Sequence, residues 1–223
     1  MALSSVAFQL QQSIRNQTDV SVTLTTHLLS NKFPNSNNNA AEVANEVNAW
    51  AEKHTNGLIK KVLEANAIDR LTWLIFANAA YFKGSWSQKF DRSKTKESIF
   101  HLLDGNNVQV PFMTSKKKQL VSEYDDFKIL GLPYIHGEDE RRLTMYFLLP
   151  HAKDGLQSLL EKISSQPNFF DRHIPVRKVP VAPPWCKPPV VDFVADHPFL
   201  FVIREDVTKV MLFMGQVIDP SVG

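Results

Sequence analysis

The side chains that most often perform catalysis or bind metals are present in this chain, but not at the spacings that such chemistry requires. The chain contains 7 histidines, a single cysteine and many serines. It lacks a GxSxG nucleophile elbow, an HExxH helix, a glycine-rich phosphate loop and a CxxC pair. Its histidines are scattered singly, without the spacing of a metal site. We therefore predict that the chain is not an enzyme, and we expect no cofactor and no metal ion.

One cysteine and one run of lysines are the remaining chemical candidates. Cys186 lies between Pro184 and Pro188, and the sequence places no base or helix N-terminus beside it to activate the thiol. The run from Lys116 to Lys118 could bind a polyanion, although adjacent lysines more often form a solvated turn. Neither feature predicts an activity by itself.

Length and composition indicate a globular protein. The 223 residues are 43% hydrophobic and 22% charged, which suits a single domain with a core. A net charge of +2 gives no argument for nucleic acid or a membrane surface, and we predict neither partner. No apolar run approaches membrane-spanning length, and the start MALSSVAFQLQQ lacks a secretory basic region. The single cysteine favours a reducing compartment, so we expect a cytoplasmic location.

The clearest predicted element is a β-hairpin near the C-terminus. Two apolar runs, Phe199 to Ile203 and Val210 to Val217, are joined by a charged linker from Arg204 to Lys209. Nearly every position of both runs is apolar, which is typical of strands buried on both faces. His197 and Pro198 precede the first run, and the proline fixes φ and removes a backbone donor, so the first strand should begin there.

The N-terminal part predicts two helices. Val20 to Leu29 carries apolar residues near a polar head and is interpreted as a first helix. The asparagine-rich tract from Asn35 to Asn39 predicts a loop or junction. From Ala40 a second helix is expected, because its apolar residues recur every three or four positions and Asn56-Gly57 supplies an exit. The next apolar run, Leu71 to Phe82, could be a buried strand or a buried helix by periodicity alone.

The middle of the chain alternates strands with turns. Ile99 to Leu103 and Val108 to Phe112 flank an Asp-Gly-Asn-Asn turn and predict a hairpin. Strands are expected over Phe127 to Leu132 and Leu143 to Leu149, each closed by a proline. A short helix is then expected after Gly155, with one apolar face formed by Leu156, Leu159, Leu160 and Ile163.

Three of these stretches resemble the serpins, the conformationally trapping protease inhibitors. The C-terminal signature of that family resembles residues 192 to 220, DFVADHPFLFVIREDVTKVMLFMGQVIDP, and the sequence is most similar to plant serpins. NAWAEKHTNGLIKKVL (48 to 63) resembles the helix that leads into the central sheet. IFANAAYFKGSWSQKF (75 to 90) is similar to the third main-sheet strand and the turn after it, which favours a strand over Leu71 to Phe82.

The resemblance implies an α+β fold, namely a partial serpin fold that lacks several N-terminal helices and main-sheet strands. We predict a single truncated domain over residues 1–223, with junctions near 31–40 and 176–191. The positions that match structural positions of the family are Asn78, Gly84, Trp86, Phe90, Asp196, Pro198, Phe199, Gly215 and Pro220.

Asn78 is the matched position with the most specific implied role. In serpins the matching asparagine belongs to a hydrogen-bond cluster that controls opening of the main sheet, and its serine and histidine partners come from segments that this chain lacks. The alternative is an amide satisfied by the backbone or by water. Trp86 and Phe90 are interpreted as bulky packing at the top of the same sheet, and Gly84 as a turn residue.

The resemblance also implies an activity whose central segment is missing. An inhibitory serpin carries a cleavable bait loop of small residues, which inserts into the main sheet as a new strand after cleavage. The segment that leads into this loop contains a Glu-Glu-Gly hinge and an alanine run. This chain has 13 prolines, and the segment VPVAPPWCKPPV (179 to 190) stands where the loop should be. Proline lacks the amide hydrogen that an interior strand must donate, so this segment cannot insert.

We therefore predict a non-inhibitory member of the family, with no catalytic residue and no reactive bond. Serine or cysteine proteases are partners by resemblance only. The alternatives are an interaction protein that holds a partner through exposed strands, and a poorly folded gene remnant. Exposed strand edges would also favour self-association. The resemblance adds the extracellular space, without a classical signal peptide, as the alternative location.

Overall fold

The computed structural model describes residues 21–30, 38–69, 72, 74–115, 117, 119–136, 141–175 and 191–222. The chain is divided between Gly84 and Ser85 into two compact units, of which the first holds the described residues up to Gly84 and the second holds those from Ser85 onward. The predicted junctions near 31–40 and 176–191 fall largely outside the described residues, so they stay predictions, as does the single domain.

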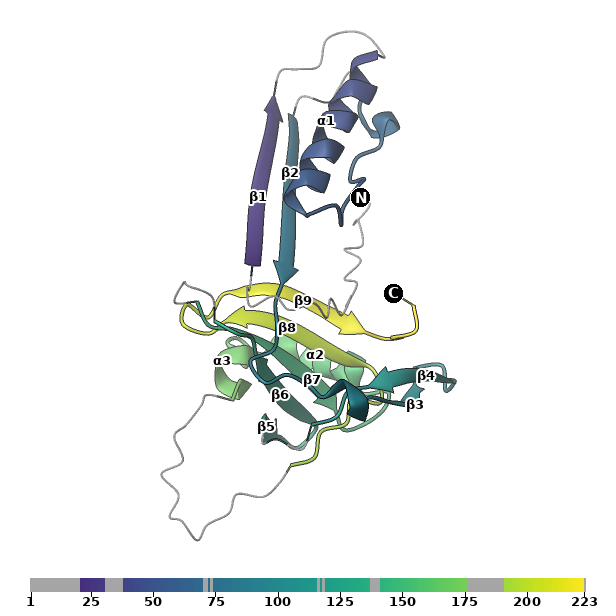
Figure 1. Ribbon diagram of the computed structural model, residues 1–223, viewed down its shortest axis with the longest axis vertical. Helices are drawn as coiled ribbons and strands as arrows, with labels where there is room; N and C mark the ends of the chain where they lie inside the picture. The colour runs from purple at the N-terminus through teal and green to yellow at the C-terminus, as the bar shows by residue number, and fades with distance from the viewer. Residues whose placement is uncertain are drawn as a thin grey trace. The chain divides into compact units, whose positions relative to one another are not determined.

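The first unit contains a two-stranded antiparallel sheet and one helix (Figure 1). Strand β1 (Ser21–Ser30) pairs along its whole length with β2 (Leu74–Lys83). Helix α1 (Asn38–His54) is followed by a short 3-10 turn, η1 (Ala65–Ala67). The buried side chains of α1 recur at helical spacing, and they are Val43, Ala44 and Val47. They form a small core with Ile68 and with the strand residues Ile75 and Ala77.

Two predictions for this unit are confirmed and one is wrong. The α1 helix ends as expected, because Asn56 and Gly57 both have positive φ angles (51° and 80°). The strand expected over Leu71 to Phe82 is β2, which begins at Leu74, whereas Leu71 and Trp73 lie outside the described residues. The helix predicted over Val20 to Leu29 is instead strand β1. The physical reason is that the segment is rich in β-branched Val and Thr, and its backbone groups bond to β2 along a ladder that local periodicity does not reveal.

The second unit is built on a five-stranded antiparallel sheet in the order β5-β6-β7-β8-β9 (Figure 1). The strands are β5 (Leu120–Glu123), β6 (Phe127–Pro133), β7 (Leu143–Pro150), β8 (Phe199–Glu205) and β9 (Met211–Val217). The predicted strands of this region are thus confirmed, and so is the C-terminal hairpin, in which Phe201 lies opposite Gly215.

Helices α2 (Leu156–Ser165) and α3 (Phe169–His173) cover one face of the large sheet. The predicted apolar face of α2 is confirmed, because Leu156 and Leu159 are buried and Leu160 and Ile163 pack on the same core. This core is centred on Phe127, whose side chain is 0% exposed. Helix α3 was not predicted from the sequence.

A second hairpin completes this unit. Strands β3 (Lys96–His101) and β4 (Asn107–Phe112) follow the 3-10 turn η2 (Arg92–Lys94). Gly105 in the turn has a φ of 84°, as the Asp-Gly signal predicts. Phe100 of β3 packs against Leu149 and Phe199 of the large sheet. The described sheets are all antiparallel and helices pack on them, so the predicted α+β class is confirmed.

The expectation that both C-terminal strands are buried on both faces is right for β8 and wrong for β9. All seven residues of β8 are buried, as expected of a strand between β7 and β9. Strand β9 is the last strand of the described sheet, and its residues are half-buried or exposed. Both C-terminal runs are almost wholly apolar, so their composition could not show which one is the central strand and which one the edge strand.

Candidate functional site

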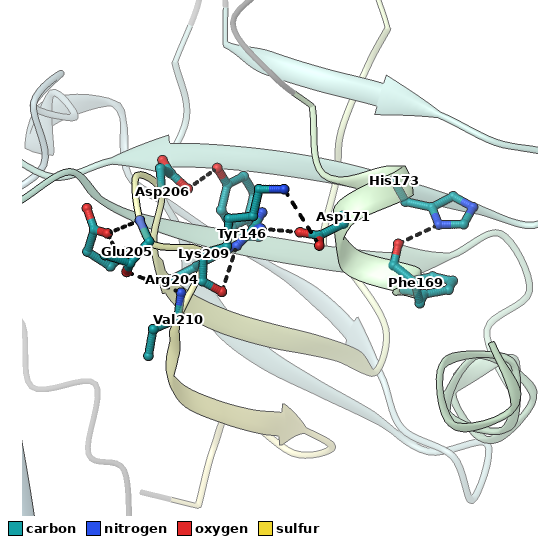
Figure 2. Close-up of polar contacts among 10 residues, drawn as sticks. Tyr146, Phe169, Asp171, His173, Arg204, Glu205, Asp206, Lys209 and Val210 are labelled. Carbon is teal, nitrogen blue, oxygen red and sulfur yellow. Dashed lines mark hydrogen bonds and ion pairs between the residues drawn. The ribbon is translucent and has the colours of Figure 1, made fainter. Parts of the chain in front are cut away.

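The turn between β8 and β9 holds a cluster of buried charged groups (Figure 2). The predicted charged linker from Arg204 to Lys209 is wrong in part, because Arg204 and Glu205 belong to β8 and are only 5% and 6% exposed. A buried charge is costly unless it is paired or hydrogen-bonded, so the partners of these residues decide what the turn can do.

Glu205 accepts hydrogen bonds through both carboxylate oxygens. Oε1 accepts from the backbone amides of Arg142 (2.9 Å) and Val207 (3.2 Å). Oε2 accepts from the amide and the hydroxyl of Thr208, both at 2.6 Å. Burial alone would raise the pKa of Glu205, but these bonds, led by those from Thr208, stabilise the charged form and lower the pKa to about 2. The Glu205 carboxylate therefore connects the turn to Arg142, directly before β7, through hydrogen bonds.

Asp206 makes a second connection to β7. Its Oδ1 accepts from the Tyr146 hydroxyl at 2.8 Å, and its Oδ2 accepts from the Thr144 hydroxyl at 2.6 Å. Its amide donates to the carbonyl of Arg142 at 2.8 Å. Burial, with a further contribution from the Asp206 charge, raises the pKa of the Tyr146 phenol. This phenol therefore acts as a donor in the neutral range.

Arg204 joins the same turn to α3. Its guanidinium Nη2 lies 2.5 Å from Oδ1 of Asp171, and its Nε donates to the carbonyl of Lys209 at 3.4 Å. The Lys209 Nζ lies 3.7 Å from the other oxygen of Asp171 (Figure 2). An open cavity of about 280 Å³ lies beside this ion pair and contains no serine, cysteine or histidine among its lining residues. The cluster therefore has a geometry suited to holding the turn.

Four of the positions matched to the family surround the β8–β9 hairpin. Asp196 precedes β8, and its Oδ1 lies 2.7 Å from Nδ1 of the buried His197, whose Nε2 donates to the Pro150 carbonyl at 2.8 Å. Pro198 is fully buried at the entry to β8, as its predicted role at the start of the strand requires. Phe199 is the first residue of β8, and its ring lies 5.7 Å from the ring of Phe147 on β7.

Gly215 lies on β9 at a point where no side chain would fit. A Cβ atom added there would lie 2.7 Å from Cζ of Phe201. We expect the Gly215→Val variant to lose about 1–3 kcal/mol of free energy of unfolding, because the Phe201 ring must leave its buried position. Urea denaturation would measure the loss. The Gln216→Val variant, at the next and exposed position of β9, is the control and should change stability by less than about 0.5 kcal/mol. Equal stabilities of the two variants would contradict the steric argument.

The remaining matched positions lie elsewhere. Trp86 stacks on Tyr134 with ring centroids 4.5 Å apart, and Phe90 is half-buried nearby in sequence. Asn78 lies in β2 opposite Thr26, and its side chain is outside the described part of the structure. Gly84 directly follows β2 and closes the first unit. Pro220 is exposed after β9. The structure therefore groups only the positions around the hairpin.

The carboxylate cluster of the turn was not predicted from the sequence. The sequence contained one signal for it, namely the charged residues Arg-Glu-Asp directly after a wholly apolar run. Charged residues at such a position either lie in a solvated turn or form buried pairs, and the sequence does not distinguish the two. Among the described residues, no group of three or more His, Cys, Asp or Glu is arranged to hold a metal ion. In the same residues no helix combines the length and apolar character needed to cross a membrane.

Comparison with known proteins identifies one family throughout. The family model described as Serpin (serine protease inhibitor) matches residues 22–181 and 175–220. Serpin-ZX of Arabidopsis thaliana is 43% identical over 259 residues, covering 81% of this chain and 66% of that protein. Serpin-ZX of Hordeum vulgare is 40% identical and covers 82% of this chain and 66% of its own length. The chain thus spans about two thirds of the length of these relatives.

Solved structures agree with the sequence comparison. The structure of Arabidopsis AtSerpin1 in its native stressed conformation superposes with a TM-score of 0.78 at 37% identity, covering 91% of this chain and 77% of that one. Uncleaved ovalbumin, at 20% identity and a TM-score of 0.70, covers 95% of this chain and 80% of its own, and shows the shared fold. The match extends over most of the chain at about 40% identity to plant serpins, and the protein therefore belongs to the serpin family.

Proposed function

We propose that this serpin-family protein does not form the covalent complex with a protease by which inhibitory serpins trap their targets. The observation that carries the proposal is the composition of the segment before β8. Seven of the 13 prolines of the chain lie there, at positions 175, 180, 183, 184, 188, 189 and 198. Trapping requires a cleaved loop to become an interior strand, and each proline removes one amide that the strand must donate.

We also propose that the chain is a truncated serpin. The family match consists of two segments that overlap at residues 175–181, beside the proline-rich segment, which supports an interruption there. The alignment with Serpin-ZX of Arabidopsis extends over 259 residues, which exceeds the 223 residues of the whole chain. Internal parts of that relative therefore have no counterpart here. These facts support the loss of the hinge and the bait loop as internal segments.

Incubation with a panel of proteases tests the proposal. Trypsin-like, chymotrypsin-like and papain-like enzymes are mixed with the chain, and the products are separated on a denaturing gel. We expect digestion fragments only, because a cleaved chain has no insertable strand. An inhibitory serpin run in parallel provides the positive control for the adduct. A band of the combined mass that resists denaturant and needs the catalytic nucleophile of the protease would overturn the proposal.

A second candidate function is the binding of a partner through an exposed strand. Strand β9 is the last strand of the described sheet and carries exposed apolar side chains, which supports this candidate. We further propose that the protein is not an enzyme and acts in the cytoplasm, or else in the extracellular space without a classical signal peptide. The third alternative, an unstable gene remnant, predicts that the purified chain melts without cooperativity.

A further inference from the structure

Strand β9 and its flanks collect a large share of the exposed apolar side chains of the described structure. Large hydrophobic residues that are at least 40% exposed occur here at Val207, Val210, Met211, Met214, Ile218 and Val222. Charge is absent from Val210 to Ile218, and so is proline. Natural edge strands are normally protected by charges, prolines or bulges that prevent pairing with another chain. Strand β9 lacks the first two protections over its whole length, and its one register shift against β8 lies at Leu212, so Phe213–Val217 is its regular part.

The opposite edge of the same sheet differs. Strand β5 is only four residues long and ends at the charged Glu123. An edge of four residues offers few backbone groups for pairing with a second copy of itself. If the sheet extends by strand pairing, β9 is therefore the edge that it would use (Figure 1).

We propose that β9 pairs antiparallel with β9 of a second copy of this chain, with Met214 on the two-fold axis, so that the two sheets form one continuous sheet. Met214 is the central residue of Met211–Val217. In this register Phe213 lies opposite Gly215 of the second copy, within the regular part of β9, and an isologous contact of this kind closes as a dimer. Every pair between the strand ends joins uncharged residues.

Charge complementarity at the ends of β9 selects this register. Lys209 lies two residues before the strand and Asp219 two residues after it. A two-fold axis at Met214 brings the end of β9 that carries Lys209 beside the end of the second copy that carries Asp219, so that two symmetric ion pairs can form. The Lys209 side chain is 60% exposed and its Nζ lies 3.7 Å from Asp171, so a pair with Asp219 would replace a long, solvent-exposed contact. A larger slip in the pairing separates the charged ends of the two strands.

The centre of the strand is also complementary in size. In this register Phe213 of the second copy lies opposite Gly215, the only residue of β9 without a side chain. The Phe201 ring of β8 already covers Gly215 within one copy, because a Cβ atom there would lie 2.7 Å from it. Two aromatic rings thus flank the glycine from neighbouring strands, an arrangement that stabilises glycines within sheets.

The inference depends on the strand-edge interaction of the preceding subsection and not on the protease proposal. Sedimentation velocity of the full chain over a range of concentrations tests it. We expect a monomer–dimer equilibrium. The Met214→Lys variant places two lysines against each other on the axis and should weaken dimerisation at least tenfold. The Val207→Lys variant is the matched control, because Val207 is 65% exposed but lies in the turn outside the paired strand.

Charge reversal tests the register itself. The Lys209→Asp variant would place like charges opposite each other and should weaken the dimer, whereas the double variant Lys209→Asp/Asp219→Lys should restore it. Circular dichroism and a melting curve verify that each variant is folded. A chain that stays monomeric at about 100 µM, a dimer unaffected by Met214→Lys, or a double variant no better than the single one would overturn the proposal. The protease result is independent of all three outcomes.

Discussion

The Phe127→Ala variant is expected to lose about 3–5 kcal/mol of free energy of unfolding. Phe127 is 0% exposed and lies in the centre of the core between the large sheet and its helices. Its ring lies 4.8 Å from the ring of Tyr124 and 5.5 Å from that of Phe169, measured between centroids. Loss of the ring leaves a cavity that the surrounding elements cannot all close. Chemical denaturation followed by circular dichroism measures the loss.

An exposed phenylalanine provides the control for this prediction. Phe76 on β2 is 67% exposed, so Phe76→Ala should cost less than about 1 kcal/mol. If Phe127→Ala does not fold at all, Phe127→Leu retains part of the volume and should show an intermediate loss of about 1–2 kcal/mol. Equal losses in the two alanine variants would show that the core between the sheet and α2 is not the main source of stability.

The Glu205→Gln variant is expected to lose about 2–3 kcal/mol at neutral pH. The carboxylate of Glu205 accepts four hydrogen bonds, from Arg142, Val207 and twice from Thr208. A glutamine turns one acceptor into an amino group that faces donors. Glu97→Gln on β3 makes the same change of charge at an exposed position and should alter stability by less than about 0.5 kcal/mol.

The effect of Glu205 must also depend on pH, with a sign that its pKa fixes. The folded state lowers this pKa from 4.5 to about 2, so the contribution of the carboxylate is fully present above about pH 4.5. It is lost as the pH falls from 4.5 towards 2, because the unfolded state takes up the proton first. The difference in stability between the wild type and Glu205→Gln should therefore shrink between pH 5 and pH 2. A difference that stays constant over this range would contradict the assigned hydrogen bonds.

The proposed loss of trapping and the proposed strand pairing rest on different parts of the chain. The hairpin of β8 and β9 is held by its own core and by the cluster around Glu205, which lie outside the proline-rich segment. Strand β9 carries neither charge nor proline, which suits it for the proposed pairing. Protease and sedimentation experiments separate the two consequences, since either can fail alone.

Local patterns in the sequence determined the elements whose hydrogen bonds and turns lie close together in the chain. The helix expected from Ala40, which forms as Asn38–His54, the hairpin with Gly105 and the α2 helix follow from periodicity and from residues that accept positive φ angles. The C-terminal sequence was also sufficient to indicate the family. These features need no distant partner, so the sequence was sufficient for them.

Tertiary structure decided the rest, because it depends on partners far away in the chain. The segment Ser21–Ser30 is a strand only because β2, which lies well beyond α1 in the chain, pairs with it. Glu205 is a buried acceptor because the Arg142 amide, 63 residues earlier, lies beside it. Strands β8 and β9 are almost equally apolar, and only the order of the sheet makes one central and the other an edge. Composition indicates which side chains are apolar, whereas the neighbouring strands determine which of those side chains are buried.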